Sequence, residues 1–97
     1  MSIKGKEAFQ DQKQTQIDLS SQRIAELAAR VDQMSEEWKG VYRRQIDALS
    51  TKVEQLRAGL HRLQLASDAT WNDVKTSVDN AWNDLRTSLN GMSTQLR

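Results

Sequence analysis

Apolar side chains recur every three or four residues along most of this chain, and this periodicity constrains the fold more than any other feature. Ile17, Ile24 and Val31 are seven residues apart, and Leu27 and Met34 lie three residues after the last two. This is the a/d pattern of a heptad repeat, in which one apolar stripe of a helix packs against another helix. We therefore predict long helices whose stripe is covered by helical partners.

The stripe changes its spacing near the middle of the chain. Trp38, Tyr42 and Ile46 step by four and four, which predicts a shift of phase near residues 38–46. Gly40 lies inside this step and weakens a helix by about 1 kcal/mol relative to Ala. A local unwinding or bend is expected here, after which regular heptads resume.

The last third of the chain has a different rhythm. The phrase "WNDVKTSV" (71–78) returns as "WNDLRTSL" (82–89), eleven residues later. Eleven residues in three turns correspond to about 3.67 residues per turn, which favours a nearly straight or slightly right-handed supercoil. We therefore expect a weakly ordered N-terminal segment (1–16), a heptad helix (17–66) and a hendecad amphipathic helix (67–97).

The composition supports an all-α fold. The chain has 97 residues, no Pro and four Gly, while good helix formers dominate. We expect a long, essentially continuous helix that forms a coiled coil. The alternative is a helical hairpin that turns at residues 66–70, where Ser67, Asp68 and Thr70 are candidate N-caps.

A single long helix cannot bury its own stripe, so we expect a homo-oligomer. A helical protein partner that fills the same stripe is a further alternative. The expected oligomer interface consists of the stripe residues Ile17, Ile24, Leu27, Val31, Met34, Trp38, Tyr42, Ile46, Leu49, Val53, Leu56, Leu60, Leu63, Trp71, Val74, Val78, Trp82, Leu85 and Leu89.

The sequence shows no pattern typical of a catalytic, cofactor or metal site. His61 is the single histidine, Cys is absent, and Glu36 and Glu37 are adjacent on a helix and so point in different directions. Metal sites need several converging ligands, and acid–base catalysis needs suitably placed groups. No glycine-rich phosphate loop is present. We predict a non-enzymatic protein without cofactor or metal.

Charge and hydropathy limit the cellular location and the classes of binding partner that we expect for this protein. The net charge is +1, so no overall field attracts nucleic acid, and nucleic-acid binding is not expected. The start of the chain lacks the apolar core of a secretory signal. No window approaches the roughly 18 apolar residues of a membrane-spanning helix. With the absence of cysteine, these features predict a cytoplasmic protein.

The repeated tryptophans allow two roles. Trp71 and Trp82 can fill a helix–helix core, or they can rest in a lipid interface as part of an amphipathic surface helix. Residues 71–90 carry two basic side chains, Lys75 and Arg86, against three aspartates. Any affinity for anionic membranes should therefore be weak. The helix–helix core is the preferred interpretation, and reversible contact with a membrane surface is the alternative.

Four phrases of the sequence resemble a known family. They are "YRRQIDAL" (42–49), "LHRLQLAS" (60–67) and the two tryptophan-led phrases, and the resemblance covers roughly residues 38–90. The family consists of short bacterial coiled-coil proteins, often labelled stress-response or apolipoprotein-like. Asp68 and Ser77 stand where its members often have Gly. The resemblance implies a small cytoplasmic, stress-associated protein and assigns no catalytic residue. Together with the stripe, it predicts a self-associating scaffold or assembly factor.

Overall fold

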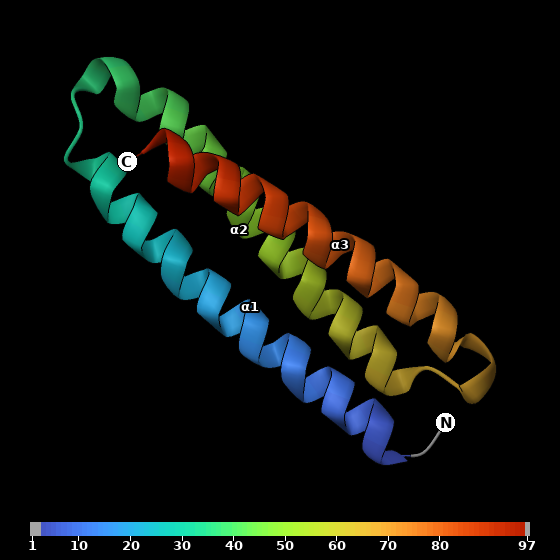
Figure 1. The fold of residues 1–97 in the computed structure, drawn as a ribbon. Helices are drawn as coiled ribbons and strands as arrows, with labels where there is room; N and C mark the ends of the chain where they lie inside the picture. The colour runs from blue at the N-terminus through green and yellow to red at the C-terminus, as the bar shows by residue number, and fades with distance from the viewer. Residues whose placement is uncertain (1–2, 97) are drawn as a thin grey trace.

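The chain that carries the periodic stripe folds into three consecutive helices that lie side by side (Figure 1). The computed structural model describes residues 3–96, with side chains described from Gly5 onward. The helices are α1 (Ile3–Asp32), α2 (Glu36–Leu65) and α3 (Asp68–Gln95), in a body of 51 × 17 × 17 Å. No strand occurs among the described residues, so the predicted all-α class is confirmed.

The chain does not form the continuous helix that we expected, because it reverses direction twice. One reversal falls at residues 66–67, inside the 66–70 range predicted for a hairpin turn, and Ser67 is the N-cap of α3. Ala66 (φ −71°, ψ 142°) and Ser67 (φ −74°, ψ 167°) both have extended backbone conformations. All L-amino acids adopt this region, so the chain turns here without Gly or Pro.

The other reversal, at residues 33–35, was not predicted. Ser35 is the N-cap of α2 in an extended conformation (φ −64°, ψ 155°), and two glutamates follow in the first helical turn. Negative charges there interact favourably with the helix dipole. The change of spacing expected near 38–46 therefore reflects the start of a new helix, and Gly40 lies within α2 rather than at a bend.

The N-terminal segment, for which the sequence predicted weak order, belongs to α1. Residues 1–2 lie outside the described residues, but the chain is helical from Ile3 onward. Phe9 packs against the core and meets the ring of Trp71 edge to face, with centroids 5.7 Å apart. Lys13 is also buried. These contacts with α3 favour the helical conformation of this polar segment.

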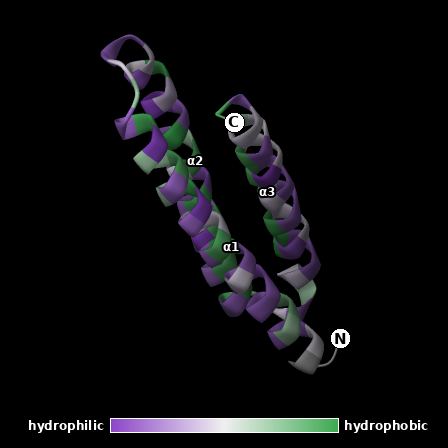
Figure 2. Ribbon diagram, turned by 60° about the vertical axis from the view of Figure 1, so that its left-hand side comes forward, coloured by the Kyte–Doolittle hydropathy of each residue, from purple (hydrophilic) through white to green (hydrophobic). Residues whose placement is uncertain are grey.

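Most of the stripe is buried within the chain itself. α2 packs along both of its neighbours, whereas the backbones of α1 and α3 approach each other much less. Hydrophobic and hydrophilic residues are interleaved along every helix (Figure 2). The buried apolar residues are Ile17, Ile24, Leu27, Val31, Ile46, Leu49, Val53, Leu56, Leu60, Leu63, Trp71, Val78, Leu85, Leu89 and Met92.

Ion pairs bridge each pair of helices. They include Arg57 with Asp18 between α1 and α2, Lys52 with Asp84 between α2 and α3, and Lys13 with Asp79 between α1 and α3. The carboxylates of these pairs are largely exposed, and such pairs contribute about 0–1 kcal/mol each. The apolar core is therefore the main source of stability.

Candidate interaction surface

Most residues predicted as an oligomer interface lie in the interior of one chain. In the folded chain, the buried members of the stripe contact the chain's own helices, and Val74 and Trp82 are partly buried against the same core. These side chains are covered before any partner binds. A partner of the folded bundle must therefore use other residues.

Three of the predicted interface residues, Met34, Trp38 and Tyr42, lie at the end of the bundle where α1 joins α2. With Val41 they form a surface that we call the tip patch. Trp38 is 55% exposed and Val41 is 51% exposed, while Met34 and Tyr42 are half-buried. An open cavity of about 320 Å³ lies here and is lined by Met34, Ser35, Trp38 and Tyr42.

The tip patch is uncovered because α3 ends before it reaches this end of the bundle. Gln95, the last residue of α3, lines the same groove as Gln45 of α2. The part of α2 that precedes Gln45 extends past the end of α3 toward the α1–α2 connection (Figure 1). Side chains on the α3-facing side of α2 therefore lose their helical neighbour at the tip patch.

The charges around the tip patch are mostly paired with one another. The Lys39 ammonium lies 3.6 Å from a carboxylate oxygen of Glu36, and the Arg43 guanidinium donates to the carboxylate of Asp32. Anionic lipid surfaces are attracted by clusters of uncompensated basic residues. Because these cations already have acidic partners, the patch is better suited to an apolar protein surface than to an anionic membrane.

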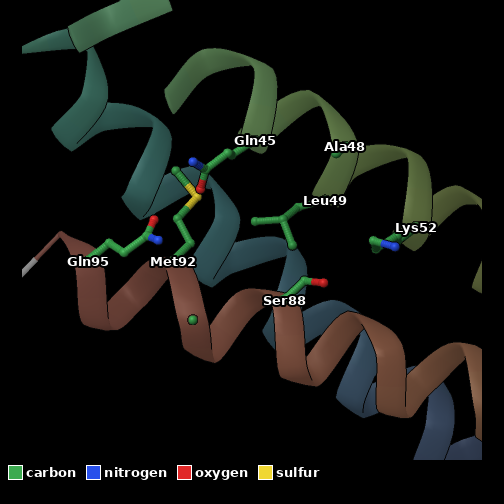
Figure 3. Close-up of a pocket in the computed structure, with 8 residues that line it drawn as sticks. Gln45, Ala48, Leu49, Lys52, Ser88, Met92 and Gln95 are labelled. Atoms are coloured by element: carbon green, nitrogen blue, oxygen red, sulfur yellow. The ribbon is translucent and has the colours of Figure 1, made fainter. Parts of the chain in front are cut away.

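A second concave region lies between α2 and α3, with a volume of about 290 Å³. Figure 3 shows Ser88 and Met92 rising from α3 toward Gln45 and Leu49 on α2. Its polar groups are mainly amides and a hydroxyl, and the Lys52 ammonium at its edge is paired with Asp84. This groove offers hydrogen bonds and a small apolar floor, but no charged group that is left for a ligand.

The apolar face that could have contacted a membrane is turned into the bundle. Trp71 is 3% exposed, Val78 is 1% exposed and Leu85 is fully buried. This face could reach lipid only if α3 separated from the other two helices. In the described part of the chain, no helix combines the length and the apolar character needed to cross a bilayer.

The remaining residues considered for catalysis or metal binding lie on the surface of the bundle. His61, Glu36 and Glu37 are exposed on α2. Across residues 5–96, no cluster of three or more His, Cys, Asp or Glu side chains is arranged to hold a metal ion. Leu19 and Leu65 are exposed at 55% and 74%, each at a distance along its helix from the tip patch.

Trp38 and Tyr42 were predicted to be interface residues of one continuous stripe. Their position at the end of the bundle follows from the turn at Ser35, whose signal in the sequence is a serine followed directly by two glutamates. Of the four exposed large hydrophobic residues that the structure describes, Trp38 and Val41 lie together in the tip patch.

Comparison with protein-family models, curated proteins and solved structures finds no significant match to this chain.

Proposed function

We propose that this protein is a non-enzymatic, cytoplasmic assembly factor that associates with a second copy of itself through the tip patch. The exposure of Trp38 beside Val41 carries this proposal. Removing large apolar side chains from water is favourable, and Trp and Tyr are enriched among the residues that dominate binding energy at interfaces. The paired charges at the rim favour a partner surface of the same kind over an anionic one.

Self-association through this patch joins two bundles end to end. In a two-fold arrangement each copy contributes the same surface, so the Trp38 ring of one copy meets the open cavity beside Met34 and Tyr42 of the other. The patch is small compared with the roughly 800 Å² per partner of a standard interface. The dimer is therefore weak and reversible, and its population depends on protein concentration. Such an assembly fits the stress-associated role implied by the family resemblance.

Sedimentation equilibrium of the full chain over a wide range of concentrations tests this function. Trp38→Glu places a charge at the centre of the patch and should weaken dimerisation by about ten-fold or more, because a desolvated charge opposes association. Leu65→Glu is the matched control, since it changes an even more exposed apolar residue at the opposite end of α2. It should leave the dimer unchanged. A monomer at every concentration, or equal weakening by both variants, contradicts the proposal.

A further inference from the structure

A second site lies in the groove between α1 and α3, close to the α2–α3 connection and therefore at the opposite end of the bundle from the tip patch. A cavity of about 430 Å³ opens there. Its lining consists of Gly5, Ala8, Phe9 and Gln12 from α1 and of Trp71 and Lys75 from α3. Small-molecule sites typically have volumes of about 300–1,000 Å³, with mostly apolar walls and a few polar groups. The composition of this cavity matches that description.

Three lysine ammonium groups surround the aromatic walls. Lys75 Nζ lies 5.2 Å from the ring centroid of Phe9 and 5.9 Å from that of Trp71. Lys6 Nζ is 5.6 Å from the Trp71 ring, and Lys13 Nζ is 5.4 Å from the Phe9 ring. The charge that this end of the groove offers to a ligand therefore depends on which of these ammonium groups have acidic partners.

The three lysines differ in their acidic partners. Lys6 pairs with Asp68, and Lys13 Nζ lies 3.5 Å from a carboxylate oxygen of Asp79. Among the described residues, no carboxylate forms an ion pair with Lys75, whose contacts are with the two rings. Lys75 lines the cavity and is half-buried. Its charge is thus the one at the cavity that the described part of the chain leaves uncompensated.

The wall beside Lys75 also contains an unsatisfied donor. The indole Nε1 of Trp71 is buried and has no hydrogen-bond acceptor among the described residues. Buried donors without acceptors are rare in folded proteins and call for an explanation. Because this N–H is inside the wall, a ligand headgroup would meet Lys75 first, and the ligand's apolar part would lie against Ala8 and Phe9. The described residues therefore contain no acceptor for this indole N–H.

We propose that this cavity binds a small anionic amphiphile, with a carboxylate or phosphate head beside Lys75 and an apolar body along Ala8 and Phe9 and against the small exposed edge of Trp71. The single uncompensated ammonium accounts for one anionic group, and the aromatic walls account for an apolar body. A neutral apolar ligand would leave Lys75 without a partner. A free amphiphile and an anionic phospholipid offer the same chemistry, and the experiment below separates them.

Calorimetric titration of the full chain with monomeric decanoate is the central measurement. The native protein should bind one equivalent saturably, and Lys75→Gln should weaken binding by about ten-fold, the usual effect of losing a hydrogen bond to a charged group. Lys52→Gln is the matched control, because Lys52 is also partly buried but is paired with Asp84 in the other groove. Decanol, which has the same apolar chain and no charge, should bind as weakly to the native protein as decanoate binds to Lys75→Gln.

A second variant tests the cavity rather than the charge. Ala8→Trp fills the space from an exposed position and keeps Lys75, so it should abolish decanoate binding while the helical circular-dichroism signal is unchanged. Equal affinity of the native protein and Lys75→Gln, or equal affinity for decanoate and decanol, overturns the proposal. Binding to vesicles of anionic phospholipid without binding to monomeric decanoate also overturns it. Sedimentation of the decanoate-bound protein measures its oligomeric state, so that ligand binding and self-association through the tip patch are tested separately.

Discussion

A Cβ atom on Gly59 would lie 3.1 Å from Cγ2 of Val78, so α2 and α3 meet at a point where even a methyl group fits only if its neighbour shifts by a few tenths of an ångström. Val78 is 1% exposed and β-branched, and it therefore has little freedom to move away. Gly59→Ala should lower the free energy of unfolding by about 1 kcal/mol, because overpacking costs about 1–3 kcal/mol and better helix propensity returns about 1 kcal/mol. Urea denaturation measures this difference.

Gly40→Ala is the matched control for this prediction. A Cβ at Gly40 meets nothing within 4 Å, so the same substitution should raise stability by up to about 1 kcal/mol. Truncation of the neighbour provides a further check, because Gly59→Ala should become stabilising in a Val78→Ala background. If Gly59→Ala stabilises the native chain as much as Gly40→Ala does, the close approach of the two helices is wrong.

Leu56 lies in the middle of the core and is 1% exposed. Leu56→Ala should lower the free energy of unfolding by about 2–5 kcal/mol, because it removes buried methyl groups and leaves a cavity. Leu65→Ala makes the same chemical change at a residue that is 74% exposed, and it should alter stability by less than about 0.5 kcal/mol. Similar losses for both variants in thermal or urea unfolding would argue against the intrachain core.

Asp68 contributes stability that depends on pH. A hydrogen bond from the Lys6 ammonium, and then the positive charge of that group, hold the pKa of the Asp68 carboxyl below its ordinary value of 3.8. A carboxyl with a lowered folded-state pKa stabilises the fold above its unfolded-state pKa, and this contribution is lost as the pH falls through the lower folded-state value. Asp68→Asn should therefore be less stable than the native chain at neutral pH and equally stable well below pH 3.8.

Lys6→Gln separates the ion pair from the other role of Asp68, which is a negative charge in the first turn of α3. If the ion pair causes the pH dependence, Lys6→Gln should remove the same pH-dependent part of the stability as Asp68→Asn. The double variant should then lose little beyond either single change. Additive losses would show that the two groups do not interact.

Ser67 should tolerate substitution better than most N-cap serines. Its side chain makes no capping hydrogen bond, whereas its backbone carbonyl accepts from the N–H groups of Thr70 and Trp71 at 3.1 and 2.9 Å. Ala preserves the carbonyl, so Ser67→Ala should cost less than about 0.5 kcal/mol instead of the typical value of about 1 kcal/mol. A larger loss in thermal unfolding would mean that the hydroxyl caps α3 in solution.

The sequence predicted which face of each helix is buried but not which helix covers it. Val53, Leu56 and Leu60 were expected at stripe positions, and all three are buried. The spacing of apolar residues determines the face of a helix. A second chain and the next helix of the same chain can cover that face equally well. The choice between them depends on the turns, for which the spacing holds little information.

The two turns were not equally visible in the sequence. Ser67 and its neighbours were identified as candidate caps. Ser35, in contrast, lies between Met34 and Trp38, whose spacing in the sequence continues the stripe. The groove between α1 and α3 was harder still to anticipate. Both α1 and α3 have a lysine four residues after an aromatic residue. These two pairs come together only because the chain reverses twice.

The central place of α2 has a consequence for how the chain reaches its folded state. Two helical hairpins, α1–α2 and α2–α3, share this helix, and each closes through a connection of only two or three residues. Most contacts therefore join segments that are near in the chain, a topology of low contact order that folds in microseconds to milliseconds. We therefore expect either hairpin to be able to form first, with the third helix docking onto it afterwards. Since the chain has no proline, refolding also lacks the slow isomerisation phase that delays many domains of this size.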